Sequence, residues 1–182
     1  MKTPKFLTTI LVCLTMLISY QVSAQDFPGL DKSPMDSASF PDDYKNANKL
    51  IKVVYSRPQL KDRSLDKLAP NGKVWRTGAN EAAELSVYVP MSLDGTMIKP
   101  GTYTLFTIPG EKEWTVILSS DLNVWGSYFY NEKNDVARIT VPVTNAEKPL
   151  EAFAMKFTPS EEGVHLNMGW GNVRIAVPFK AE

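Results

Sequence analysis

The sequence has little of the chemistry on which many enzymes depend. It holds one cysteine, Cys13, and one histidine, His165, among its 182 residues. Transition-metal sites usually draw several ligands from these two residue types, so metal catalysis fits the chain poorly. A serine–histidine–acid hydrolase would need His165 as its base, yet no glycine-flanked serine elbow accompanies it. We therefore expect no metal and no cofactor, and we interpret His165 as a surface residue of a strand.

An excess of charge of one sign is also missing. The chain carries 20 Lys and Arg residues against 20 Asp and Glu residues, and no block of like charge interrupts it. Nucleic acids and anionic membranes select basic patches or stripes. We therefore expect neither as a partner, which leaves a small molecule, a glycan or a peptide as the expected ligand.

The only long apolar run lies at the N-terminus. A basic start is followed by apolar residues from Phe6 to Ser19 and then by the small residues Val22-Ser-Ala24, which a signal peptidase reads. The run is too short for a membrane span of about 20 residues. Residues 1–24 are predicted to be a signal peptide cleaved near Ala24. The protein is then expected to be soluble and secreted into the periplasm or the medium. Cys13 leaves with this segment, so no disulfide is expected.

The next segment has the composition of a linker. Residues 25–46 are rich in Asp, Ser, Pro and Lys and show no hydrophobic periodicity. We interpret them as a flexible N-terminal spacer, with an ordered extension as the alternative. Residues 47–182 are expected to form one domain.

After Asn46, apolar and polar residues alternate with period two, which is typical of half-buried strands. Only Ser64 to Leu68 is compatible with a short helical turn, and no stretch of ten residues shows a helical stripe. We predict an all-β fold, a single antiparallel sandwich of about eight strands, with a jelly roll or squat barrel as the alternative. The expected inward positions are Ile51, Val53, Tyr55, Leu85, Val87, Val89, Trp114, Val116, Leu118, Ile139, Val141, Val143, Phe153, Met155, Phe157, Val164, Leu166, Met168, Trp170, Val173, Ile175, Val177 and Phe179.

Glycine and proline mark the turns between these strands. Asp94-Gly95, Pro100-Gly101 and Pro109-Gly110 each stand between two apolar runs. Glycine supplies the positive φ that tight turns need, and proline presets a corner. By the same reasoning, Trp170-Gly-Asn172 is predicted to be the tip of a final hairpin.

One connecting segment differs from an ordinary turn. Loops that only join strands are mostly small and polar, whereas the segment from Lys73 to Glu84 contains an aromatic ring, a guanidinium, an amide and two carboxylates around Gly78. Gly78 is expected to let the backbone turn sharply. The side chains concerned are Trp75, Arg76, Asn80, Glu81 and Glu84.

A second arginine is a candidate for the same site. Arg57 follows Tyr55 by two residues and therefore points to the same side of its strand. If the two strands are neighbours, Arg57 and Arg76 would frame one polar pocket with Asn80 and Glu81. The alternative is structural: an arginine is costly to bury unpaired, so Arg76 would form an internal ion pair with Glu81 or Glu84.

Three segments together carry a resemblance to a known family. They are Val54-Tyr-Ser-Arg-Pro58, the segment Lys73–Glu84, and Gly101-Thr-Tyr-Thr-Leu-Phe-Thr-Ile-Pro-Gly110. With them, residues 33 to 179 resemble the bacterial domain-of-unknown-function 2911 family. The resemblance points to the same motif residues and implies no particular activity for them.

A second aromatic cluster lies in Asn123-Val-Trp-Gly-Ser-Tyr-Phe-Tyr130. Exposed aromatic rings form platforms for sugars, but the spacing of Tyr128 and Tyr130 also fits strand packing, with Trp125 as a core residue. We favour packing here and keep Trp125 as a candidate for the rim of the polar pocket.

These observations support three functional hypotheses. The first is a non-catalytic envelope domain that binds a small ligand, sugar or peptide through Arg57, Arg76, Asn80 and Glu81, rimmed by Trp125. The second is a carbohydrate-active hydrolase or lyase with Glu81 as its acid or base, a weak candidate for a catalytic residue. The third is an assembly or interaction protein that uses an exposed sheet edge or its N-terminal tail.

Overall fold

The computed structural model describes residues 25–181. The chain divides into two units, residues 1–30 and Asp31–Glu182. Residues 25–30 of the first unit contain no helix or strand. The predicted signal peptide, residues 1–24, lies outside the described residues. In the part of the chain described, no helix is long and apolar enough to cross a membrane.

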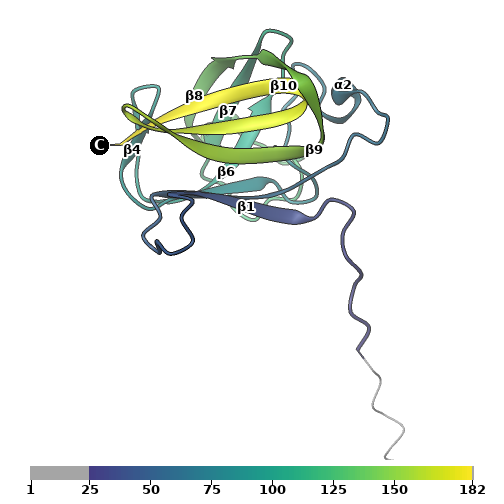
Figure 1. Ribbon diagram of the computed structural model, residues 1–182, viewed down its shortest axis with the longest axis horizontal. Coiled ribbons are helices and arrows are strands. Elements are labelled where there is room, and N and C mark those ends of the chain that lie inside the picture. The colour runs from purple at the N-terminus through teal and green to yellow at the C-terminus, as the bar shows by residue number, and fades with distance from the viewer. Residues whose placement is uncertain (1–24, 182) are drawn as a thin grey trace, which may run out of the picture. The chain divides into compact units, whose positions relative to one another are not determined.

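Strands dominate the second unit, with one short α-helix and one 3-10 turn (Figure 1). The elements are β1 (Met35–Phe40), β2 (Ile51–Ser56), α2 (Leu65–Leu68), β3 (Ala83–Val87), β4 (Met91–Leu93), β5 (Thr96–Ile98), β6 (Gly101–Ile108), β7 (Glu113–Ser119), η2 (Glu132–Asn134), β8 (Asp135–Pro142), β9 (Thr144–Ser160) and β10 (Gly163–Ala181).

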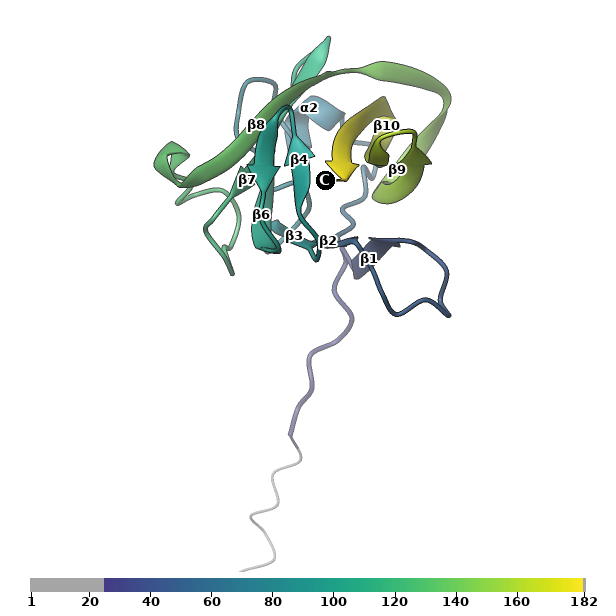
Figure 2. The ribbon, with the colours of Figure 1, turned by 90° about the vertical axis from the view of Figure 1, so that its left-hand side faces the viewer.

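The strands form two antiparallel sheets that are not closed into a barrel. One sheet has the order β1-β2-β3-β6-β7-β8 and the other the order β5-β4-β10-β9. Figures 1 and 2 show the long β9–β10 ribbon curling over one face of the larger sheet. The predicted all-β sandwich is confirmed, and the squat barrel alternative is wrong.

The core lies between the two sheets and is centred on aromatic rings. Trp75 is only 4% exposed and stacks on Trp170 with ring centroids 5.5 Å apart. The ring of Phe153 meets Trp75 edge-on at 5.1 Å, and Trp114 does so at 6.1 Å. Ring contacts of this kind add about 0.5–1.5 kcal/mol each beyond the area they bury. Trp75 of the candidate motif is therefore a core residue that fixes where the motif begins.

The local predictions for turns and helix are largely confirmed. Asp94 and Gly95, with φ of 48° and 77°, join β4 to β5, and positive φ at both positions is the conformation that matches strand twist in a two-residue hairpin. Pro100 precedes β6, and Pro109-Gly110 begins the connection from β6 to β7. The helical turn Leu65–Leu68 lies in the segment expected to contain it.

The expected final hairpin at Trp170-Gly-Asn172 is wrong. Strand β10 continues through this point from Gly163 to Ala181, and its pairing with β9 shifts register on both sides of Gly171. The buried hydrophobic side chains of β10 fall on even numbers up to Trp170 and on odd numbers from Ile175 onward. The surplus residues of this irregular pairing lie in β9, because Gly169 to Val173 of β10 face the longer stretch from Ala154 to Asn145. In β10 itself, the alternation breaks beside Gly171, which has a φ of 53°.

Part of the expected spacer is a strand. β1 lies inside residues 25–46 and pairs with β2 from Met35 opposite Ser56 to Phe40 opposite Ile51. For these six residues the flexible interpretation is wrong and the ordered alternative holds. An edge strand with one partner needs little apolar surface, so its polar composition resembles that of a linker.

Candidate functional site

The candidate motif is an excursion from a strand position. Trp75 forms an isolated bridge with Thr107 of β6, and Ala83 at the start of β3 pairs with Leu105, which lies two residues before Thr107 in β6. The amide of Ala83 donates to the carbonyl of Arg76 at 3.1 Å and closes the loop between them. Residues 76–82 therefore form a loop that projects from the sheet, and the residues on either side of it pair with neighbouring positions of β6.

The backbone of this loop is tightly constrained. Thr77 and Asn80 adopt φ values of 53° and 60°, a region that Asn tolerates but a β-branched residue rarely enters. Thr77 is fully buried, and its hydroxyl donates to Thr107 Oγ1 at 3.2 Å. Gly78 does not form a left-handed turn. It lets the loop backbone approach β2 closely, because a Cβ at this position would lie 3.1 Å from the carbonyl oxygen of Ser56. The surrounding structure holds the loop in one shape.

A second loop, residues 120–131 between β7 and β8, is fastened to the first. The amide of Ala82 donates to Val124 O at 2.9 Å, and the amide of Gly126 donates to Asn80 O at 3.0 Å. These two bonds make Glu81 and Trp125 direct neighbours in a short antiparallel bridge. The two loops, about forty residues apart in sequence, form one surface.

Tyr130 anchors the far end of the second loop. Its ring packs edge-on against Phe106 at 5.2 Å, and its hydroxyl donates to Asp135 Oδ2 at 2.8 Å. Desolvation by burial, followed by the hydrogen bond to the Asp135 carboxylate, raises the pKa of Tyr130 to about 12. Because the phenol stays protonated, it remains a donor to Asp135, and the loop base is held in place at neutral pH.

The aromatic residues of the second loop face solvent. Trp125 is 59% exposed, Tyr128 78% and Phe129 82%, and Leu122 beside them is 47% exposed. Packing of Trp125 into the core is therefore wrong as an interpretation, although Tyr130 does pack as expected. Residues 122–131 contain no charged side chain. They present an uncharged aromatic surface next to the carboxylate of Glu81.

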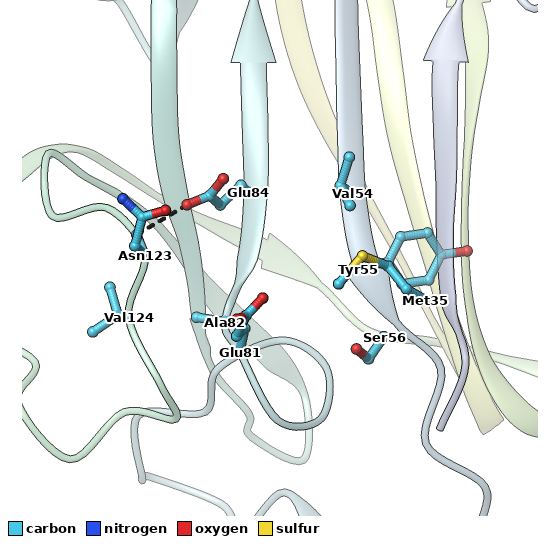
Figure 3. Close-up of a pocket in the computed structure, with 9 residues that line it drawn as sticks. All are labelled: Met35, Val54, Tyr55, Ser56, Glu81, Ala82, Glu84, Asn123 and Val124. Carbon is cyan, nitrogen blue, oxygen red and sulfur yellow. Dashed lines mark hydrogen bonds between the residues drawn. The ribbon is translucent and has the colours of Figure 1, made fainter. Parts of the chain in front are cut away.

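A small depression of about 60 Å³ lies beside this surface (Figure 3). In the close-up, Glu81 and Glu84 stand between Val54 and Ser56 on one side and the second loop on the other. Glu84 is already engaged, because its Oε1 accepts from the amide of Asn123 at 3.0 Å. Glu81 is exposed and takes part in no side-chain hydrogen bond or ion pair among the described residues.

Arg76 has no acidic partner among the described residues. Neither Glu81 nor Glu84 forms an ion pair or hydrogen bond with its guanidinium, and its Nε is buried with no acceptor. The internal Arg76–glutamate ion pair considered from sequence is therefore wrong. More than nine in ten buried polar atoms have a partner, so this unpaired donor sets Arg76 apart from a residue kept only for structure.

Arg57 is directed elsewhere. It follows the last residue of β2 and points to the same side as Tyr55, as the spacing predicts. Its Nε donates to Phe153 O of the opposite sheet at 3.0 Å. Its Nη1 forms an ion pair with Asp36 of β1 at 3.0 Å. Of the five predicted ligand-binding residues, only Glu81 lines the depression. Backbone contacts bring Asn80, Glu81 and Trp125 together where the two loops meet, but they do not join Arg57 to them.

Sequence reasoning missed two contributors to this surface. Asn123 contacts Glu84 through its backbone amide. Every residue except proline has such an amide, so the residue type at position 123 does not reveal the contact. Met35 of β1 lines the depression, but it sits in a segment whose composition indicated a spacer. Among the described residues, no group of three or more His, Cys, Asp or Glu side chains gathers to hold a metal ion.

Together these features define an all-β sandwich protein with a rigid, aromatic and polar two-loop surface at one end of its larger sheet. The chain belongs to the family described as protein of unknown function DUF2911, whose model matches residues 33–179. No curated protein and no solved structure matches the chain.

Proposed function

We propose that the protein is a non-catalytic binding domain, exported to the cell envelope, that takes a small ligand, a sugar or a peptide on its two-loop surface. The signal-like residues 1–24 support export. The surface is formed by the loops of residues 76–82 and 120–131, and Asn80, Glu81 and Trp125 are its central side chains.

The observation that carries the proposal is the exposure of Trp125. Main-chain bonds on both sides fix its backbone to Asn80 and Ala82, yet 59% of its surface faces solvent. An aromatic ring held still in water loses little further entropy on binding, and its face suits the CH groups of a sugar or an apolar side chain. Glu81 beside it supplies hydrogen-bond acceptors for hydroxyl or amide groups.

Arg76 gives independent support. A buried donor that lacks an acceptor is destabilising by about 1–3 kcal/mol. Residues maintained against stability in this way are common at binding sites. The Nε of Arg76 is buried, but the two Nη groups of its half-buried side chain have no partner among the described residues. They would be the donors for a carboxylate, carbonyl or hydroxyl of the bound molecule.

The proposal is tested by calorimetry with neutral oligosaccharides and short peptides as probes, at millimolar concentration. We expect at least one probe to bind the wild-type protein, and Trp125→Ala to weaken that binding more than about tenfold, as the loss of a central aromatic contact does. Glu81→Gln keeps the side-chain shape and removes its charge, so it should weaken binding less.

Tyr88→Ala is the matched control. Tyr88 is 50% exposed and follows β3 at the end opposite Glu81, so its removal should leave affinity unchanged. Trp125→Ala should alter the free energy of unfolding by no more than about 0.5 kcal/mol, as an exposed substitution does. Equal affinities of the Trp125→Ala and Tyr88→Ala variants, or no binding by any probe, would count against the proposal.

A further inference from the structure

A second concave surface lies on the outer side of the β9–β10 ribbon, away from the two loops. It is a groove of about 450 Å³, within the range of about 300–1,000 Å³ that small-molecule sites occupy. The side chains of Leu150, Ala154 and Lys156 line it from β9, and Asn167 and Arg174 line it from β10. The groove lies where the pairing of β9 with β10 is irregular, on both sides of Gly171.

Arg174 carries a positive charge that no described carboxylate balances. Its Nη1 donates to Gly171 O at 2.8 Å and to Val173 O at 2.7 Å, and its Nη2 donates to Lys148 O at 2.8 Å. A guanidinium has five N–H donors, so Nε–H and one hydrogen of Nη2 have no acceptor among the described residues. The three carbonyl contacts hold the guanidinium in a fixed orientation.

The side chain of Arg174 lies against Gly169, which also lines the groove. A Cβ placed on Gly169 would lie 3.1 Å from Arg174 Nε, 2.9 Å from Arg174 Cδ and 3.0 Å from Leu150 Cδ1. The absence of a side chain at Gly169 therefore allows the arginine and the leucine to lie side by side. A cationic group and an apolar group meet at one point of the groove.

The remaining lining matches this chemistry. Lys156 is exposed and adds a second positive charge, while Leu150 and Ala154 supply apolar surface. Among the described residues that line the groove there is no Asp or Glu. We propose that the groove binds a small organic carboxylate with an apolar body. Its carboxylate would accept from the free donors of Arg174, with Lys156 beside it.

The test uses sodium octanoate as the probe, titrated into the full mature chain by calorimetry. Octanoate should bind more tightly than acetate, because only octanoate fills the apolar part of the groove. It should also bind more tightly than inorganic phosphate, which has charge but no apolar body. Lys156→Glu should weaken octanoate binding by about tenfold or more, because it puts a like charge beside the carboxylate.

Lys112→Glu is the matched control, because Lys112 is an exposed lysine in the turn between β6 and β7 and makes the same change of net charge. Trp125→Ala should leave octanoate binding intact, which separates this site from the two-loop surface. Any one of three results would overturn the assignment. The first is no octanoate binding at about 10 mM, which means a binding free energy weaker than about 2.7 kcal/mol. The second is phosphate binding as tight as octanoate binding, and the third is equal affinities of the two lysine variants for octanoate.

Discussion

At the residue scale, Trp75 and Arg76 are adjacent in sequence but differ in burial and in the contacts of their side chains. Trp75 is buried and stacks on Trp170 in the core, so its identity follows from packing. Arg76 is half-buried, and its Nε has no acceptor. The sequence placed both in one motif. The ion pair that would have made Arg76 structural is missing between the described residues.

Unfolding in urea distinguishes a structural role of Arg76 and Glu81 from a role in binding. We expect Arg76→Met to leave the free energy of unfolding unchanged or to raise it by up to about 1 kcal/mol, because it removes a desolvated donor and keeps the length of the side chain. Glu81→Ala, at an exposed position, should change it by no more than about 0.5 kcal/mol. A loss of about 3–5 kcal/mol in both variants would instead reveal a buried ion pair.

At the element scale, β10 shows how a bulge replaces a turn. Two apolar runs of opposite parity require a break in the alternation between them, and either a hairpin or an irregular pairing with the partner strand can provide it. Because β9 is 17 residues long, it pairs with both halves of β10 and favours the bulge. The alternation predicted both runs correctly, but the choice between turn and bulge depends on a partner strand that is distant in the chain.

Two glycines in β10 should respond differently to alanine. Gly171 has a φ of 53°, and the nearest atom to an added Cβ is 3.8 Å away, so only the left-handed backbone is penalised, by about 1–2 kcal/mol. At Gly163 the φ is 155° and the added Cβ would meet Phe179 O at 2.2 Å. We expect Gly163→Ala to destabilise the protein more than Gly171→Ala in urea unfolding. Equal losses of unfolding free energy in the two variants would contradict this account of the two glycines.

At the scale of the whole molecule, the second unit relies on its core. The only cysteine, Cys13, lies in the predicted signal peptide, so an exported domain would have no disulfide to restrain it. The larger sheet is completed at one edge by β1, whose residues Ala38 and Phe40 pack against the core. The ion pair between Asp36 and Arg57 also depends on β1.

Truncation therefore locates the start of the folded unit. A mature chain that begins at Ser33 should have an unchanged thermal midpoint, because residues 25–32 contain no helix or strand. A chain that begins at Asp42 loses β1 and the packing of Phe40, and we expect it to be less stable by about 2 kcal/mol or more. If both chains melted together, β1 would contribute nothing to the fold.

The sequence by itself determined the fold class, the positions of most strands and turns, and the unusual composition of the Lys73–Glu84 segment. These are local properties, because period-two alternation and glycine or proline turns act within a few residues. Only the tertiary structure decided that Trp125 faces solvent, that Arg57 turns to Asp36, and that β10 runs through Gly171. Each of these depends on strand order and register between residues far apart in the chain, which local patterns do not encode.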